Sequence, residues 1–235
     1  MPYRNLSLDD FAKHVGMDAR VVRRMADRGE LPGHKVGGEW RFNRAQITEW
    51  LQVKMHTFDE ERLISLEQTM GAESGDLVVT SLIGWEGVDV SLPARTRASV
   101  LRELVKLAER TGQLFDAKGL LEALEQREAL CSTALMYGVA IPHPRQPMPY
   151  ASAEPLICVG RLSKGIGFGS PYHDLSRLFF LICCHDDRHH LRVLARLMRI
   201  LDQETIERLM EVESREALLD ALIDKEKQVT TSARG

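Results

Sequence analysis

Short apolar runs alternate with longer amphipathic stretches from about residue 75 to about residue 228, and this alternation limits the fold more than any other feature. The apolar runs have the length and composition of buried strands, and they lie at 137–144, 155–162 and 176–184. Apolar residues at helical spacing fill the stretches around them, at 97–112, 116–130, 189–201, 204–212 and 214–227. Strands interleaved with helices predict an α/β fold in which helices cover a central sheet.

The first 55 residues have a different pattern, which is typical of a small helical module with a hairpin. Ser7 opens a capping-box sequence, and Asp18 is suited to cap a second helix. The pair Gly37-Gly38 lies between two alternating segments, which predicts a tight hairpin. Asn43 then predicts the start of a third helix. The expected order is helix, turn, helix, hairpin, helix.

Charge divides the chain in the same place. Residues 1–55 hold ten Lys and Arg against seven Asp and Glu, whereas the remainder holds 21 against 27, which indicates two functions in one chain. Residues 56–74 predict an amphipathic connector helix that ends in a flexible joint. The apolar face of this helix would dock on either domain or pair with a second copy in a homodimer. We therefore expect domains at 1–55 and 75–228, and a flexible tail at 229–235.

The helical module resembles a known class of DNA-binding domain. The segments ADRGELP, KVGGEWRF and ITEWL are similar to the winged helix-turn-helix of the excisionase and MerR-like group. The resemblance implies that the second helix enters the major groove, where arginine pairs with guanine edges or phosphates. The alternative is a solvated arginine-rich helix on a protein-interaction module. The side chains expected to contact DNA are Arg20, Arg23, Arg24 and Arg28 on the helix, and Lys35 and Arg41 on the hairpin.

A single histidine in the larger domain has an unusual backbone environment. His143 lies between Pro142 and Pro144 at the end of an apolar run, and the prolines restrict the backbone on both sides. A neutral imidazole has a free nitrogen lone pair near neutral pH, so it can act as a nucleophile without a separate base. The alternative is a structural histidine at the end of a strand.

The motifs around this histidine are LLEALEQREAL, Ser132-Thr133, VAIPH and HLRVLARL. Together they resemble enzyme IIA of the fructose/mannitol class of the phosphoenolpyruvate-dependent phosphotransferase system, which includes a nitrogen-regulatory branch. The resemblance implies a mixed sheet flanked by helices. It also implies that His143 accepts a phosphoryl group from the phosphohistidine of the carrier protein HPr and passes it to a separate IIB-like or regulatory protein. It assigns His190, in preference to His189, as a second active-site histidine and Arg127 as an active-site arginine.

Donors to the phosphoryl oxygens are expected near His143, because these oxygens carry negative charge. Arg145 is expected to supply a charge-assisted hydrogen bond, and the helix start at 188–190 is expected to supply backbone N–H groups. Ser132 and Thr133 either line the site or cap a turn. Transfer between two histidines needs no metal and no cofactor, and we predict none.

The rim of this expected site departs from the usual pattern of the class. Met136-Tyr137-Gly138 stands where Gly-Asn-Gly is typical, and Pro144 stands where glycine is usual. Proline lacks the backbone N–H that would otherwise face the phosphate. These departures leave open which proteins serve as donor and acceptor.

The cysteines do not indicate a secreted or metal-binding protein. Four cysteines, two of them adjacent, do not resemble a disulfide framework, and the N-terminal sequence lacks the character of a signal peptide. No apolar stretch approaches the roughly 18 residues of a membrane helix, so we expect a cytoplasmic protein with reduced thiols. The segment CCHDDRHH, at 183–190, lacks a regular ligand spacing, and we interpret its cysteines as buried small side chains rather than zinc ligands.

These patterns together predict a DNA-binding regulator that is also a histidine phosphoryl carrier. Phosphorylation of the enzyme IIA-like domain would bias DNA binding by residues 1–55 through added negative charge. One alternative is a phosphoryl carrier for sugar uptake, which would need separate IIB-like and membrane partners. Another is an enzyme IIA-like sensor that is not phosphorylated.

Overall fold

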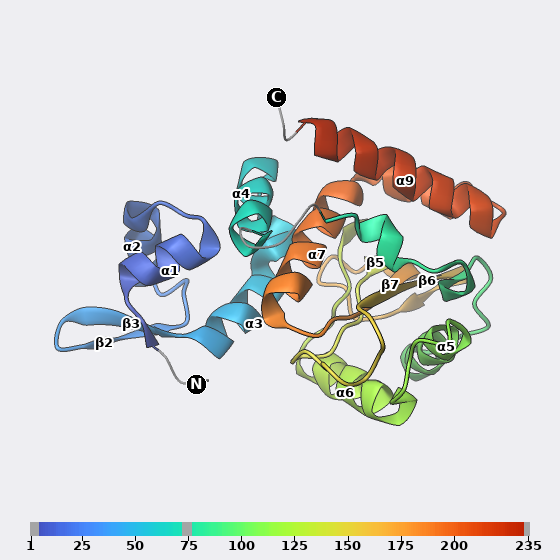
Figure 1. Ribbon diagram of the computed structural model, residues 1–235, viewed down its shortest axis with the longest axis horizontal. Helices are drawn as coiled ribbons and strands as arrows, with labels where there is room; N and C mark the ends of the chain where they lie inside the picture. The colour runs from blue at the N-terminus through green and yellow to red at the C-terminus, as the bar shows by residue number, and fades with distance from the viewer. Residues whose placement is uncertain (1–4, 72–76, 233–235) are drawn as a thin grey trace. The chain divides into compact units, whose positions relative to one another are not determined.

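The computed structural model describes residues 5–71 and 77–232 (Figure 1). Its contacts divide the chain into two compact units. The first unit contains the residues up to Leu77 together with Leu191–Arg199, and the second contains Val78–His190 and the residues from Ile200 onward. One helix, α7 (Asp187–Ile200), therefore contributes residues to both units.

The first unit begins with the helical module that the sequence predicts. Its elements are β1 (Asn5–Leu6), α1 (Leu8–Val15), α2 (Ala19–Asp27), β2 (Gly33–Val36), β3 (Glu39–Asn43) and α3 (Arg44–Lys54). The side chains of Ser7, Asp18 and Asn43 accept backbone N–H groups in the first turns of the three helices, as expected. The strands form a sheet in the order β1-β3-β2, and the rings of Phe11 and Phe42 lie 4.7 Å apart between centroids in the core.

The connector helix, α4 (Glu60–Gly71), docks within the first unit. The hydroxyl of Ser65 donates to the carbonyl oxygen of Gly16 at the end of α1, at 2.7 Å. The apolar stripe of the helix is buried within the single chain. Its buried residues are Leu63, Leu66 and Met70.

A buried cluster of charges joins α4 to the α7 residues of the same unit. The carboxylate of Glu67 accepts hydrogen bonds from Nε of Arg196 at 3.0 Å and from Nη1 of Arg199 at 2.9 Å. Arg196 also donates to the carbonyl oxygen of Leu77 at 3.2 Å. A buried ion that loses its partner destabilises a protein strongly, so these contacts fix the two helices to each other.

The second unit is built on a mixed four-stranded sheet in the order β4-β6-β7-β5. The strands are β4 (Val88–Asp89), β5 (Val139–Ala140), β6 (Leu156–Gly167) and β7 (Leu175–Cys183). β4 runs parallel to β6 and β5 runs parallel to β7, whereas β6 and β7 are antiparallel, with Leu156 opposite Cys183. The predicted α/β fold with a mixed sheet is confirmed.

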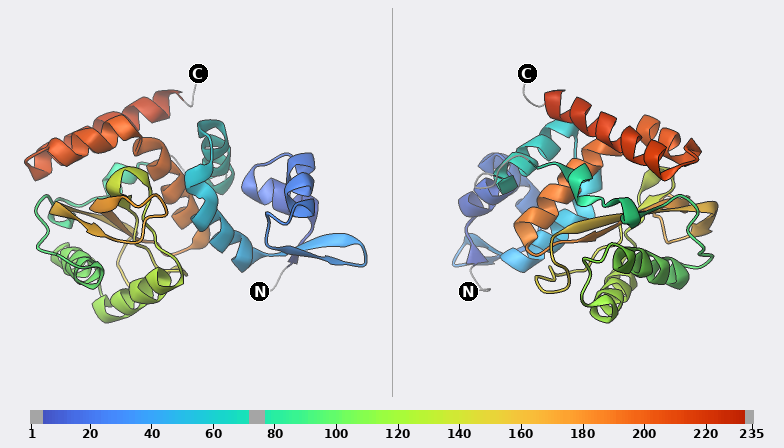
Figure 2. Two further views of the ribbon diagram at one scale, coloured as in Figure 1. Left: turned by 180° about the vertical axis from the view of Figure 1, so that it is seen from behind. Right: turned by 45° about the vertical axis from the view of Figure 1, so that its right-hand side comes forward.

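Helices cover both faces of this sheet (Figure 2). α5 (Arg97–Arg110) and α6 (Ala117–Leu130) lie on one side, and α9 (Arg215–Ser232) lies on the other, packed against α8 (Gln203–Glu211). Because both faces are covered, consecutive residues of β7 are buried, which explains its uninterrupted apolar sequence. The core between the sheet and α5 and α6 includes Leu104, Leu120, Leu124, Phe168, Phe179 and Leu181.

The strand that leads to His143 is shorter than the sequence predicts. Within the run at 137–144 only Val139–Ala140 form a strand paired with β7, and a 3-10 turn, Met136–Gly138, precedes these two residues. Tyr137 and Gly138 have φ angles of 58° and 75°, in the left-handed region, so they cannot continue a ladder. A Cβ added at Gly138 would lie 2.9 Å from the carbonyl oxygen of Leu175, which favours glycine there.

The sequence predicts two flexible segments, a joint after the connector helix and a C-terminal tail, and the structure describes only part of them. The tail predicted at 229–235 is helical as far as Ser232, because α9 continues through it. The joint expected at the end of the connector falls largely on residues 72–76, outside the described residues. In the part of the chain that the structure describes, no helix is both long enough and apolar enough to cross a membrane.

Candidate functional site

His143 follows β5 on a segment that is anchored to the sheet. The carbonyl oxygen of Pro142 accepts the N–H of Ile182 on β7 at 3.0 Å. Nδ1 of His143 lies 2.7 Å from the carbonyl oxygen of Ile141, and a carbonyl only accepts, so Nδ1 carries the proton. The lone pair is therefore on Nε2, which is buried and has no hydrogen-bond partner among the residues that the structure describes.

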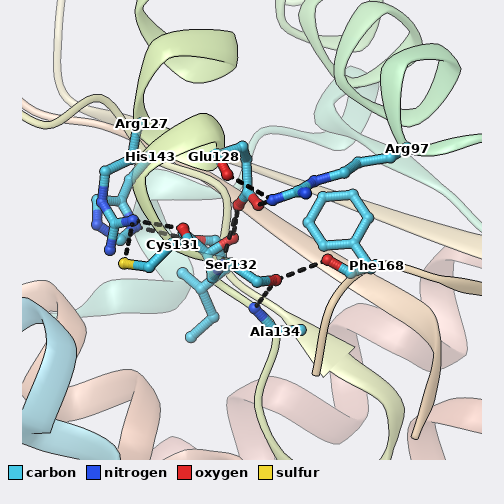
Figure 3. Close-up of polar contacts among 10 residues, drawn as sticks. Arg97, Arg127, Glu128, Cys131, Ser132, Ala134, His143 and Phe168 are labelled. Carbon is cyan, nitrogen blue, oxygen red and sulfur yellow. Dashed lines mark hydrogen bonds and ion pairs between the residues drawn. The ribbon is translucent and has the colours of Figure 1, made fainter. Parts of the chain in front are cut away.

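Two other candidate site side chains lie beside this ring, each from a different helix. The ring of His190, in the first turn of α7, lies 4.9 Å from the ring of His143 between centroids. Arg127, in the last turn of α6, lies beside His143 (Figure 3). Its Nη1 donates to the carbonyl oxygen of Cys131 at 2.8 Å and to the Sγ of that residue at 3.2 Å. The structure thus brings together the three residues that the sequence singles out.

Burial keeps both imidazoles neutral. Their exposures are 3 % for His143 and 4 % for His190. Desolvation, followed by the charges of His190 and Arg127, lowers the pKa of His143 well below its usual 6.5. Desolvation, followed by the charges of Arg127 and His189, lowers the pKa of His190 to about 4. The ring of His143 is therefore uncharged at neutral pH.

These pKa values predict how stability depends on pH. Below pH 6.5 the unfolded chain binds protons that the folded rings do not, so the free energy of unfolding falls as pH decreases towards about 4. The loss contributed by one such ring is up to about 1.4 kcal/mol per pH unit. We expect His190→Gln to lose less stability than the wild type between about pH 7 and about pH 4.5 in urea unfolding. Equal losses in the two proteins would contradict the lowered pKa of His190.

Ser132 and Thr133 were expected either to line the site or to cap a turn. Their hydrogen bonds stabilise a turn. The hydroxyl of Ser132 donates to the carbonyl oxygen of Phe168 at 2.7 Å and accepts the N–H of Ala134 at 3.1 Å. The hydroxyl of Thr133 donates to the carboxylate of Glu128, which also accepts the N–H of Thr133 at 3.1 Å.

The other groups expected to bind the phosphoryl oxygens are Arg145 and the backbone N–H groups at the start of α7. Arg145 is exposed, two residues beyond His143. The expectation that α7 offers N–H groups of residues 189 and 190 is wrong. The N–H of His189 donates to the Asp186 carboxylate at 2.8 Å, and the N–H of His190 donates to the carbonyl oxygen of Asp186 at 3.1 Å. Asp186 thus occupies these two groups as part of the helix start.

The basic residues of the first unit lie largely on its surface. Arg20, Arg23 and Arg24 are exposed on α2, and Arg28, just beyond that helix, forms an ion pair with Glu30 at 2.7 Å.

On the hairpin, Lys35 lies 4.9 Å from the centroid of the Trp40 ring and 3.4 Å from Asp27, and Arg41 forms an ion pair with Glu39 at 2.7 Å. The hairpin cations are thus held by neighbours, whereas Arg20, Arg23 and Arg24 are exposed along α2.

One buried charge near the site, that of Glu128, is absent from the sequence-based expectations. Leu120, Leu124 and Glu128 follow one another at four-residue spacing on α6, and all three are buried. A carboxylate that continues an apolar stripe is the signal that identifies it.

No group of three or more His, Cys, Asp or Glu side chains suited to a metal ion occurs among the described residues. Cys183 and Cys184 are buried, as interpreted from the sequence, and burial raises the pKa of both thiols.

Comparisons with known proteins agree with this architecture. Residues 82–225 match the model of the phosphoenolpyruvate-dependent sugar phosphotransferase system EIIA 2 family, and residues 6–54 match that of a helix-turn-helix domain. The chain belongs to the EIIA 2 family and carries a helix-turn-helix domain ahead of its EIIA domain.

Individual relatives show how far the similarity extends. A nitrogen regulatory protein of Bradyrhizobium diazoefficiens is 34% identical over 149 residues, which cover 61% of this chain and 94% of that protein. The fructose-specific EIIABC component of Bacillus subtilis is 28% identical over 152 residues, which cover 63% of this chain but only 24% of that protein. The crystal structure of nitrogen regulatory protein IIA-Ntr from Neisseria meningitidis superimposes with a TM-score of 0.55 at 26% identity, over 61% of this chain and 98% of that one.

Proposed function

We propose that this protein is a cytoplasmic DNA-binding regulator whose EIIA domain accepts a phosphoryl group on Nε2 of His143. The donor is the phosphohistidine of an HPr-like carrier protein, and the phosphorylation state alters DNA binding by the helix-turn-helix domain. The observation that carries this proposal is a neutral ring whose Nε2 has no partner among the described residues, beside Arg127 and His190. The EIIA 2 family match supports a role in phosphoryl transfer.

The transfer itself needs only the groups at the site. The Nε2 lone pair attacks the phosphorus of the donor, and the new N–P bond forms as the donor's N–P bond breaks, with that electron pair returning to the donor ring. Nδ1 of His143 keeps its proton, which remains hydrogen-bonded to the carbonyl oxygen of Ile141. Arg127 offsets the negative charge that arrives. Because His143 is only 3 % exposed, the side chains around it move aside when the donor binds.

A continuous helix offers a route from this site to the first unit. His190 lies in the first turn of α7, and Arg196 and Arg199 lie farther along the same helix. Their guanidinium groups bind Glu67 of α4, which in turn packs on α1. A phosphoryl group next to His190 would change the charge at the start of α7, and a shift of that helix would reach the DNA-binding module through Glu67.

The test uses the full chain in two assays on one sample. The protein is incubated with phosphoenolpyruvate, enzyme I and HPr from its own source, and label uptake and DNA retention are measured with and without donor. We expect label on His143 and a change in DNA retention. Uptake without any change in DNA retention would instead identify a phosphoryl carrier, and DNA retention without uptake would identify a sensor that is not phosphorylated.

The DNA-binding part of the proposal makes its own prediction. Replacing Arg23 and Arg24 together by alanine removes two exposed cations of α2, and we expect DNA affinity to fall about tenfold or more, with a salt slope reduced by about two. Filter retention over a range of salt concentrations measures both quantities. Arg102→Ala, which removes an exposed arginine of the second unit, is the matched control and should bind DNA normally. Wild-type affinity in the double variant would exclude this face of α2.

A further inference from the structure

The buried carboxylate of Glu128 lies where three hydrogen-bond donors converge. It accepts an ion-paired hydrogen bond from Nη2 of Arg97, the N–H of Thr133 at 3.1 Å, and the hydroxyl of Thr133 (Figure 3). Its side chain is only 3% exposed. Each carboxylate oxygen accepts at least one hydrogen bond, so the buried carboxylate ties Arg97 to Thr133.

Arg97 is itself held in place on the other side. Its Nη2 also donates to the carbonyl oxygen of Glu128 at 2.6 Å, and its guanidinium lies over the ring of Phe168, 5.3 Å from the centroid. The start of α5 is thereby joined to the end of α6, one residue away from Arg127.

The contacts continue from Glu128 to the ring of His143. The carbonyl oxygen of Thr133 accepts the N–H of Ile141 at 3.1 Å, and the carbonyl oxygen of Ile141 in turn accepts Nδ1–H of His143 at 2.7 Å. A neutral imidazole can carry its proton on either nitrogen, and the hydrogen bond to one nitrogen decides which. The position of the Ile141 carbonyl therefore determines that the lone pair is on Nε2.

From these contacts we propose that Glu128, held by Arg97, is a positioning residue for phosphoryl transfer, which rests on the function proposed above. Through Thr133 and Ile141, Glu128 keeps the His143 ring in its Nδ1–H tautomer and in a fixed orientation beside Arg127. Glu128 does not touch the phosphoryl group. It acts by fixing the backbone that holds the nucleophile.

The experiment compares Glu128→Ala with Glu125→Ala, an exposed glutamate on the same helix, in the full chain. The rate of phosphoryl uptake at saturating donor is expected to fall about ten- to hundredfold in Glu128→Ala, because a misplaced nucleophile loses orientation. The donor concentration at half-saturation should stay the same. In ¹⁵N spectra of labelled histidine, the His143 signals should shift towards the Nε2–H tautomer. Glu125→Ala should match the wild type in all three measurements.

A second pair of variants, at Thr133, tests the same proposal in case Glu128→Ala does not fold. Thr133→Ser retains the hydroxyl that binds Glu128 and should behave as the wild type, whereas Thr133→Val removes it and should shift the tautomer and lower the rate. Unchanged ¹⁵N signals of His143 in Thr133→Val and in folded Glu128→Ala would overturn the proposal, whatever the rate. The tautomer measurement needs no donor, so it gives an answer even if the wild type takes up no phosphoryl group.

Discussion

Replacing His143 by alanine is expected to abolish phosphoryl uptake from a phosphorylated HPr-like donor. His143 combines an Nδ1 that donates to the carbonyl oxygen of Ile141 with a preceding residue, Pro142, that is hydrogen-bonded to β7, and this arrangement holds Nε2 in place. Alanine removes the nucleophile while leaving Arg127 and His190 in place. Label uptake, followed by mass spectrometry of the intact protein, measures the result.

The control for this variant is His34→Gln, which changes an exposed histidine on the hairpin of the first unit. It should take up label at the wild-type rate. Since the rings of His143 and His190 are 4.9 Å apart, His190 is the residue to which label would move if the assignment were reversed. Uptake by His143→Ala at the wild-type level, with label on His190, would contradict the proposed nucleophile.

Replacing Arg127 by methionine is expected to lower the rate of phosphoryl uptake by about 10²- to 10³-fold, the usual effect of losing one aligned donor at a site of developing negative charge. Methionine keeps much of the side-chain volume but removes the guanidinium beside His143. The charge of Arg127 also contributes to lowering the pKa of His190 to about 4, so this pKa should rise in the variant. Single-turnover kinetics and an NMR titration of His190 measure the two effects.

Arg102→Met is the matched control for this prediction, because it removes an exposed arginine of α5. It should change neither the rate nor the titration. If Arg127→Met keeps the wild-type rate while the pKa of His190 rises, Arg127 affects the electrostatics of the site without stabilising the transfer. If neither changes, Arg127 is only a structural partner of Cys131.

The parts of the fold that follow from local chemistry could be predicted from the sequence. Ser7, Asp18 and Asn43 cap helices because their side chains bond to N–H groups two or three residues away. The order of the strands could not be read in this way, since β4 and β6 pair across 71 positions of sequence through Val88 and Val159. The helical structure of residues 229–232 was also missed, because α9 extends into this polar stretch, where Val229 is buried.

For the candidate site, the sequence predicted which residues would take part, from the family resemblance and from the chemistry of single side chains. It did not predict the contacts between them. The three residues His143, His190 and Arg127 come from motifs far apart in the sequence, and the structure brings them together. The N–H groups at the start of α7 were expected to be available, but Asp186 takes two of them, a contact that spacing alone does not reveal. Glu128 was overlooked because its partners are Thr133 and Arg97, and Arg97 lies 31 positions away in the sequence.

The first unit, which contains the helix-turn-helix domain, is not a fragment that can be cut out intact. Nine of its residues, Leu191–Arg199, come from a helix more than a hundred positions later in the chain. A truncation after Leu77 would leave the Glu67 carboxylate without its two guanidinium partners, a loss of about 3–5 kcal/mol for a buried ion pair broken on one side. Chimaeras that graft the first unit onto another protein would therefore leave the Glu67 carboxylate buried and unpaired unless they also carry α7.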